Sequence, residues 1–196
     1  MRLSGRKSMT FRLTMLFALS STVVLLLLGY LIAGSIERHF EEQDMKVLTG
    51  KLKLAQHALE KVRSTADLDV LRPQLDDSLV GHHGLTMVVV APQGQILFAT
   101  SGAEFPQSLL ESHVRVDSAR PTVWTTKDNH PLRGISALAR TGIKDAQPAI
   151  VAVAIDISHH KHFMSSFRMT LWSIVVLAAL LTGFLGWLAV RRGLAP

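Results

Sequence analysis

Two long uncharged runs constrain this chain more than any other feature. Leu13–Ala33 is 21 residues without a charge, and Met169–Val190 is 22. Because about 20 apolar residues in a helix cross the hydrocarbon core of a bilayer, each run is long enough to span a membrane. The first run is too long for the apolar part of a signal peptide, and no small-residue cleavage pattern follows it. The sequence therefore predicts two transmembrane helices.

The distribution of charge orients these two helices. All 15 Asp and Glu lie within residues 35–168, and only 6 of the 21 Lys and Arg lie outside that segment. Those six are Arg2, Arg6, Lys7, Arg12, Arg191 and Arg192. Since basic residues are enriched on the cytoplasmic side of membrane helices, we expect both termini in the cytoplasm and the middle segment outside. The basic character thus reflects topology, and we expect no nucleic acid as a partner.

A repeating apolar pattern follows the first run. Its members are Met45, Leu48, Leu52, Ala55, Leu59 and Val62. Their spacings of three and four residues make a heptad pattern of roughly two and a half repeats, which predicts a helix. The helix could pack on its own domain, or it could pair with its twin in a dimer. The pattern is too short to separate these interpretations.

The rest of the middle segment predicts strands. Residues 64–72 can end the first helix or form a second short one before Pro73, and residues 106–114 can form another short helix. The predicted strands are 85–90, 96–100, 123–125, 134–140 and 149–155, with turn residues at 92–94 and 142–148. We therefore expect an α+β sensor module of about five strands between two membrane helices. The chain has no cysteine, so this module needs no disulfide.

Histidines gather beside both predicted membrane helices. His159, His160 and His162 precede the second run, and His39 follows the first. At about 1.5 Å per residue, both segments lie within roughly two helical turns of the same membrane surface. Neutral imidazole suits copper, zinc and nickel, so a metal site near the membrane is one interpretation. A set of solvated histidines above the lipid headgroups is the other.

Two further histidines are adjacent in the sequence, and the chain lacks catalytic motifs. His82 and His83 lie between two glycines, where a turn would usually leave both rings solvated, so they are a weaker candidate for a metal site. The chain has no cysteine and no Met-x-Met sequence, which excludes an all-sulfur site for monovalent copper. It also has no phosphate-binding glycine loop and no nucleophile motif, so we expect no catalysis by this segment.

Three strings in the sequence are typical of one protein family: Ser35–Asp44, Ala154–Phe163 and the Gly193–Pro196 ending. The most specific piece is His-Phe-x-Glu-Gln-Asp at 39–44. These strings resemble the sensor region of copper- and silver-sensing histidine kinases of the CusS/CopS type. The resemblance covers nearly the whole chain. It implies a periplasmic PAS-like (PDC-type) fold, a homodimer, and a metal ion bound at the dimer interface close to the membrane.

The resemblance also implies a ligand set. It assigns His39, Phe40 and His160 to the metal, with His159 and His162 as register alternatives for His160. The resemblance implies that the sensed ion is copper, with silver or zinc as alternatives. A second, internal site of some family members uses a methionine pair, and the matching stretch Lys127–Leu132 contains no methionine. We therefore expect the interface site alone.

These expectations divide the chain as follows: a cytoplasmic tail at 1–12, a membrane helix at 13–34, a periplasmic sensor at 35–168, a second membrane helix at 169–190, and the start of a HAMP linker at 191–196. We expect the sequence to be truncated within that linker. We also expect the protein to lie in the bacterial inner membrane. A kinase domain that uses ATP, and a cognate response regulator, are expected from the resemblance alone. The alternatives are a non-enzymatic two-span protein that binds metal or a partner, and the same input on a chemoreceptor or cyclase.

Overall fold

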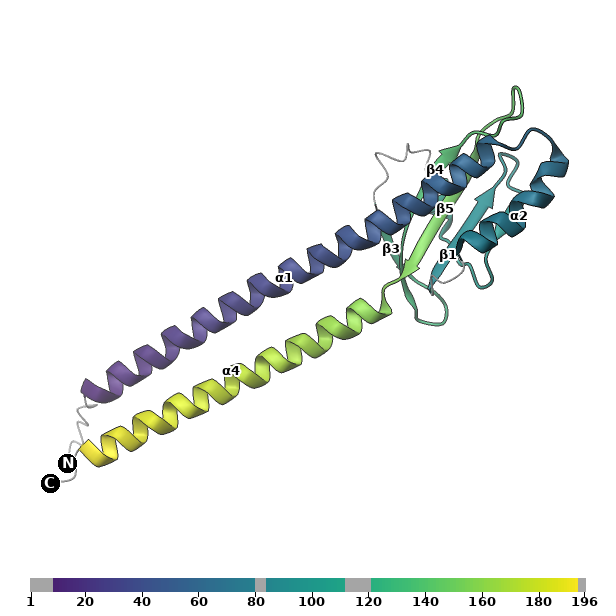
Figure 1. Ribbon diagram of the computed structural model, residues 1–196. Helices are drawn as coiled ribbons and strands as arrows, with labels where there is room; N and C mark the ends of the chain where they lie inside the picture. The colour runs from purple at the N-terminus through teal and green to yellow at the C-terminus, as the bar shows by residue number, and fades with distance from the viewer. Residues whose placement is uncertain (1–8, 80–83, 112–120, 194–196) are drawn as a thin grey trace. The chain divides into compact units, whose positions relative to one another are not determined.

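The computed structural model describes residues 9–79, 84–111 and 121–193. The chain divides into two compact units, one formed by Phe40–Lys161 and the other by Met1–His39 together with His162–Pro196. The first unit lies inside the predicted sensor segment, and the second contains the predicted membrane helices. Figure 1 traces the chain through both.

The first unit is built on one antiparallel sheet. Its strands are β1 (Leu85–Val90), β2 (Ile96–Ala99), β3 (Thr122–Thr125), β4 (Pro131–Ala139) and β5 (Ala149–Asp156), in the order β2-β1-β5-β4-β3. The predicted α+β class is confirmed. β4 begins at Pro131, earlier than predicted, because residues 131–134 pair with β3. The predicted short helix near 106 is α3 (Gln107–Leu110), and residues 112–114 of that prediction lie outside the described residues.

The C-terminal part of α1 (Met9–Glu60) supplies the other half of this core. The side chains of Leu48, Leu52, Ala55 and Leu59 are fully buried. They cluster with sheet residues that include Met87 and Ile135. The heptad pattern therefore packs on its own domain, as one interpretation predicted. Pairing of this pattern with a twin helix is wrong, because one chain already buries it.

A second helix, α2 (Thr65–Leu79), completes the core and corrects a prediction. It does not stop before Pro73 but continues through it. A proline inside a helix removes one backbone hydrogen bond, yet Leu71, Leu75 and Leu79 are buried on the inner side and hold both halves in place. Tertiary packing thus outweighs the local signal.

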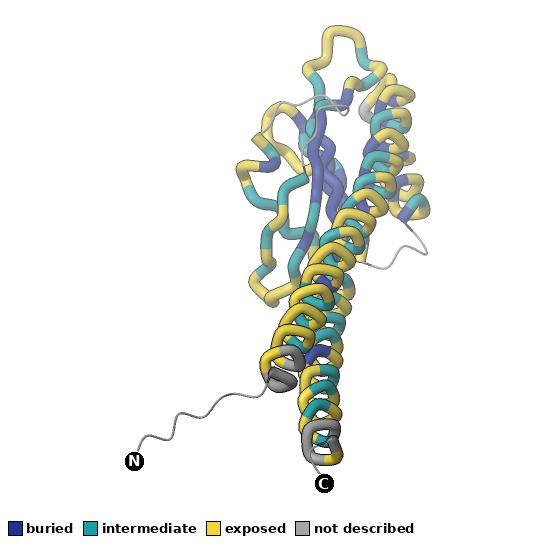
Figure 2. Tube along the Cα trace, turned by 90° about the vertical axis from the view of Figure 1, so that its left-hand side faces the viewer, coloured by how far each residue is buried: buried dark blue, intermediate teal, exposed yellow. Residues whose placement is uncertain are grey.

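The second unit consists of two long helical segments. They are the N-terminal part of α1 and most of α4 (Ser158–Gly193), and neither helix is interrupted. Gly29 lies so close to Leu171 that a Cβ at position 29 would overlap the leucine side chain. Both helices are long and apolar enough to cross a membrane, and only 6% of each apolar window is buried. In Figure 2 these segments are mostly yellow, while the central strands of the sheet are mostly dark blue, so lipid suits the two helical segments better than a soluble core.

Candidate metal centre

Phe40 and Asp44 are one helical turn apart on α1, so both side chains lie on the same face. Asp44 is buried, with 4% of its side chain exposed. Its Oδ2 accepts a hydrogen bond from Nη1 of Arg133 on β4 at 2.7 Å. Because an isolated charge is costly to bury, this ion pair accounts for a carboxylate inside the domain.

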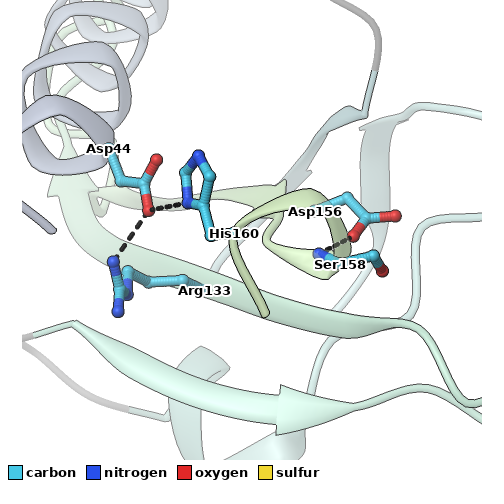
Figure 3. A network of polar contacts seen from close by, with 5 residues as sticks. All are labelled: Asp44, Arg133, Asp156, Ser158 and His160. Atoms are coloured by element: carbon cyan, nitrogen blue, oxygen red, sulfur yellow. Dashed lines mark hydrogen bonds and ion pairs between the residues drawn. The ribbon is translucent and has the colours of Figure 1, made fainter. Parts of the chain in front are cut away.

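His160 meets the same carboxylate from the first turn of α4. Its Nδ1 lies 3.5 Å from Oδ2 of Asp44 (Figure 3). Its imidazole ring stacks on the Phe40 ring, with the centroids 4.2 Å apart and the planes 8° from parallel. The structure therefore brings together two of the residues that the sequence predicted as ligands, Phe40 and His160.

The position of His160 depends on where α4 begins. The carboxylate of Asp156 accepts a hydrogen bond from the backbone N–H of Ser158 at 2.7 Å (Figure 3). Burial raises the pKa of Asp156, but hydrogen bonds from Ser158 and the nearby His130 outweigh it, so the pKa is lowered overall. His130 Nδ1 lies 3.4 Å from the second oxygen of Asp156. Asp156 therefore caps the first turn of α4.

The remaining predicted site residues are three exposed histidines and two that lie outside the described residues. His39 is exposed on α1, and His159 and His162 are exposed on α4. His82 and His83 lie outside the described residues. Across the described parts of the chain, no three His, Cys, Asp or Glu side chains are grouped so that they could hold a metal ion. Within the described residues, the candidate centre therefore consists of His160 with Phe40 and Asp44 beside it.

Sequence reasoning missed Asp44 and Arg133. One signal was available for Asp44: it ends the string at 39–44 and lies on the face that carries Phe40 and Leu48, where an apolar residue is expected. No signal pointed to Arg133, since it is 89 residues away in the sequence. Together these residues place a carboxylate behind one nitrogen of His160, which leaves the other nitrogen for a ligand.

Comparison with known proteins identifies the family of this chain. A model of the CusS sensor domain matches residues 6–164. The chain belongs to the CusS sensor domain family. The matched range includes both histidine segments and the whole sheet, so the family resemblance seen in the sequence is confirmed.

Curated relatives of the CusS sensor domain family extend beyond this chain. The sensor protein CopS of Pseudomonas syringae pv. tomato is 29% identical over 192 residues, which are 96% of this chain and 37% of CopS. The probable sensor protein PcoS of Escherichia coli is 27% identical over 195 residues, which are 96% of this chain and 41% of PcoS. The sensor protein CzcS of Cupriavidus metallidurans is 30% identical over 189 residues and covers 96% of this chain and 37% of CzcS. The chain thus spans about two fifths of the length of these relatives.

Among solved structures, the CusS sensor domain with silver bound is 16% identical, with a TM-score of 0.46 over 65% of this chain and 97% of that one. The sensor domain of the zinc-responsive histidine kinase CzcS from Pseudomonas aeruginosa is 23% identical, with a TM-score of 0.30 over 57% of this chain and 93% of that one.

Proposed function

We propose that this chain is the periplasmic metal-sensing and transmembrane signalling region of a sensor histidine kinase. The sensed ion is copper, with silver and zinc as the alternatives to be separated by titration. The chain works as a homodimer in the bacterial inner membrane, with both termini in the cytoplasm. A HAMP linker, an ATP-using kinase domain and a response regulator follow from membership of a sensor-kinase family.

One observation carries this proposal: Phe40 and His160 stack beside a buried carboxylate. These residues are distant in sequence and come from two different helices, yet they are the ones that the histidine strings single out. An imidazole held in a fixed orientation is a better metal ligand than a solvated one, because less conformational freedom is lost on binding. A solvated histidine cluster gives no reason for this stack.

The ion completes its coordination between two copies. In this proposal, His160 of one protomer and His39 of its partner bind one ion, and Phe40 shields it. Two symmetric sites would then stabilise one arrangement of the dimer by several kcal/mol, which is enough to shift a two-state equilibrium. Since α4 is one continuous helix from Ser158 to Gly193, it connects the site to the cytoplasmic side.

The test replaces His39, His160 and both with Ala in the full-length kinase and measures a metal-induced reporter. Since the two ligands share one ion, each single change should remove most of the response and the double change should add little. His57→Ala is the matched control, because His57 lies on the same helix with 70% of its side chain exposed. Copper, silver and zinc are compared in separate titrations.

A normal response from His39→Ala would refute the shared site. A response that survives in His160→Ala but not in His159→Ala or His162→Ala would assign the ligand to another histidine of the cluster. A full-length protein that responds to none of the three metals would refute metal sensing.

A further inference from the structure

The ion pair of Asp44 and Arg133 joins α1 to β4 inside the sensor unit. Only 4% of the Asp44 side chain and 13% of the Arg133 side chain are exposed. A buried ion pair of this kind seldom stabilises a fold more than apolar side chains of similar volume would. Its position beside His160 suggests a role in the site.

The Asp44 carboxylate faces one nitrogen of the His160 ring. Nδ1 is buried, makes no hydrogen bond within the described residues, and lies 3.5 Å from Oδ2 of Asp44. An ionised carboxylate can only accept a hydrogen bond, so a neutral imidazole in this place carries its proton on Nδ1. The lone pair is then on Nε2, the nitrogen that points away from Asp44 (Figure 3).

Phe40 fixes the remaining freedom of the ring. The two rings are nearly parallel, so rotation of the imidazole out of its plane would break the stack. With the plane set by Phe40 and Nδ1 set by Asp44, the direction of the Nε2 lone pair is determined. Arg133 occupies the Asp44 oxygen that faces the ring, which keeps this carboxylate in place behind the histidine.

We propose that Asp44, held by Arg133, is a positioning residue that fixes the tautomer of His160 and directs Nε2 toward the metal ion. A carboxylate behind a ligating histidine has this effect in many metal sites, where its loss lowers affinity about 10- to 100-fold. The proposal rests on the proposed function, since it assumes that His160 is a ligand. Asp44 itself is not a ligand here, because Arg133 already pairs with its charge.

The test uses the whole 196-residue chain in lipid nanodiscs and two measurements. The first is the ¹⁵N chemical shift of the His160 ring without metal, assigned with His160→Gln, which reports which nitrogen carries the proton. The second is titration with silver, copper and zinc ions. The key variant is Asp44→Leu with Arg133→Met, which replaces the ion pair by apolar side chains and should fold with unchanged or greater stability. Asp44→Asn is the conservative second variant.

Wild type should show the proton on Nδ1. The double variant should lose this preference and bind metal about 10- to 100-fold more weakly while it stays folded. Asp44→Asn should show a mixture, because its amide can present either an oxygen or an NH₂ group to the ring. Glu60→Gln is the matched control: it alters an exposed carboxylate–histidine pair, His57 Nδ1 and Glu60 Oε2 at 3.7 Å, and should leave both readouts of His160 unchanged.

Three results would overturn the proposal: a proton on Nε2 in wild type, a tautomer that is unchanged in the folded double variant, or unchanged affinity in that variant. A merely structural role predicts that affinity follows stability, whereas positioning predicts that affinity falls while stability holds. If wild type binds none of the ions, the proposed function fails, and the ring shifts without metal still decide whether Asp44 fixes the tautomer.

Discussion

The two parts of α1 belong to one continuous helix, yet their apolar side chains lie in opposite environments. In the N-terminal part, Leu16, Phe17 and Val24 are 64%, 72% and 59% exposed. In the C-terminal part, Leu48 and Leu52 are 0% exposed. Burial therefore does not depend on helix formation itself. It depends on how the apolar side chains are arranged around the helix.

The spacing of the apolar residues explains this difference. Residues 13–33 are apolar on every side of the helix, so no single protein surface could cover them, whereas lipid surrounds a helix completely. Residues 45–62 are apolar on one stripe, with Lys46, Lys51 and Lys53 between its members. One sheet covers such a stripe. Because the stripe is already buried within one chain, it gives no reason to expect a coiled coil.

The largest effect should come from the buried stripe. We expect Leu52→Ala to lower the free energy of unfolding of the sensor by about 2–5 kcal/mol, because it leaves a cavity in a packed core. Leu27→Ala, in the exposed part of the same helix, should leave that free energy unchanged. Urea titration of the nanodisc-embedded protein, followed by the fluorescence of Trp124 with Trp172 and Trp187 replaced by Phe, measures both.

Equal losses in the two variants would contradict the comparison, since they would mean that the two parts of α1 are packed alike. No loss in either variant would show that the stripe does not support the sensor core.

The sequence predicted the strands and the membrane helices, because each depends on residues that are close together in the sequence. Strands and membrane helices show in the sequence as runs of apolar or β-branched residues, so their existence could be predicted. The course of α2 through Pro73 could not, because it depends on the burial of Leu71 and Leu75 against distant residues. The choice between one chain and two for the heptad pattern likewise depended on the sheet.

Some residues of the candidate site could likewise be predicted from short strings, whereas others depend on tertiary structure. His39 and Phe40 could be proposed from a short string, and three histidines were evident before the second run. Which of the three reaches Phe40 depends on the point where α4 begins, which Asp156 sets through one hydrogen bond. The pairing of Asp44 with Arg133 joins a helix to a distant strand and leaves no local pattern.

The second effect concerns the apolar part of α1 and should be intermediate. Gly29→Leu should destabilise the packing of the two apolar helices by about 1–3 kcal/mol, because the new side chain must displace Leu171. Gly34→Leu is the control on the same helix, since an added Cβ there meets nothing within 4 Å. Titration with a denaturing detergent, followed by circular dichroism, measures the loss of stability.

Adding Leu171→Ala to Gly29→Leu should restore part of the lost stability. A Gly29→Leu variant as stable as the Gly34→Leu variant would show that the helices do not touch at Gly29.

The smallest effect tests the sensor end of α4, which carries His160 and then continues into the second apolar segment. Asp156→Ala should cost about 1 kcal/mol of sensor stability, because the first turn of α4 loses its cap. Asp156→Asn should cost less at neutral pH, since its oxygen can still accept the hydrogen bond from Ser158.

The pKa of Asp156 is lowered from its ordinary value of 3.8. The charge of Asp156 therefore contributes stability that is fully present above that value and is lost as the pH falls through the lower folded pKa. Urea titrations at pH 7 and pH 3 should therefore show a wild-type advantage over Asp156→Asn that shrinks in acid, and an advantage of the same size at both pH values would mean that the charge of Asp156 does not stabilise this end of the helix.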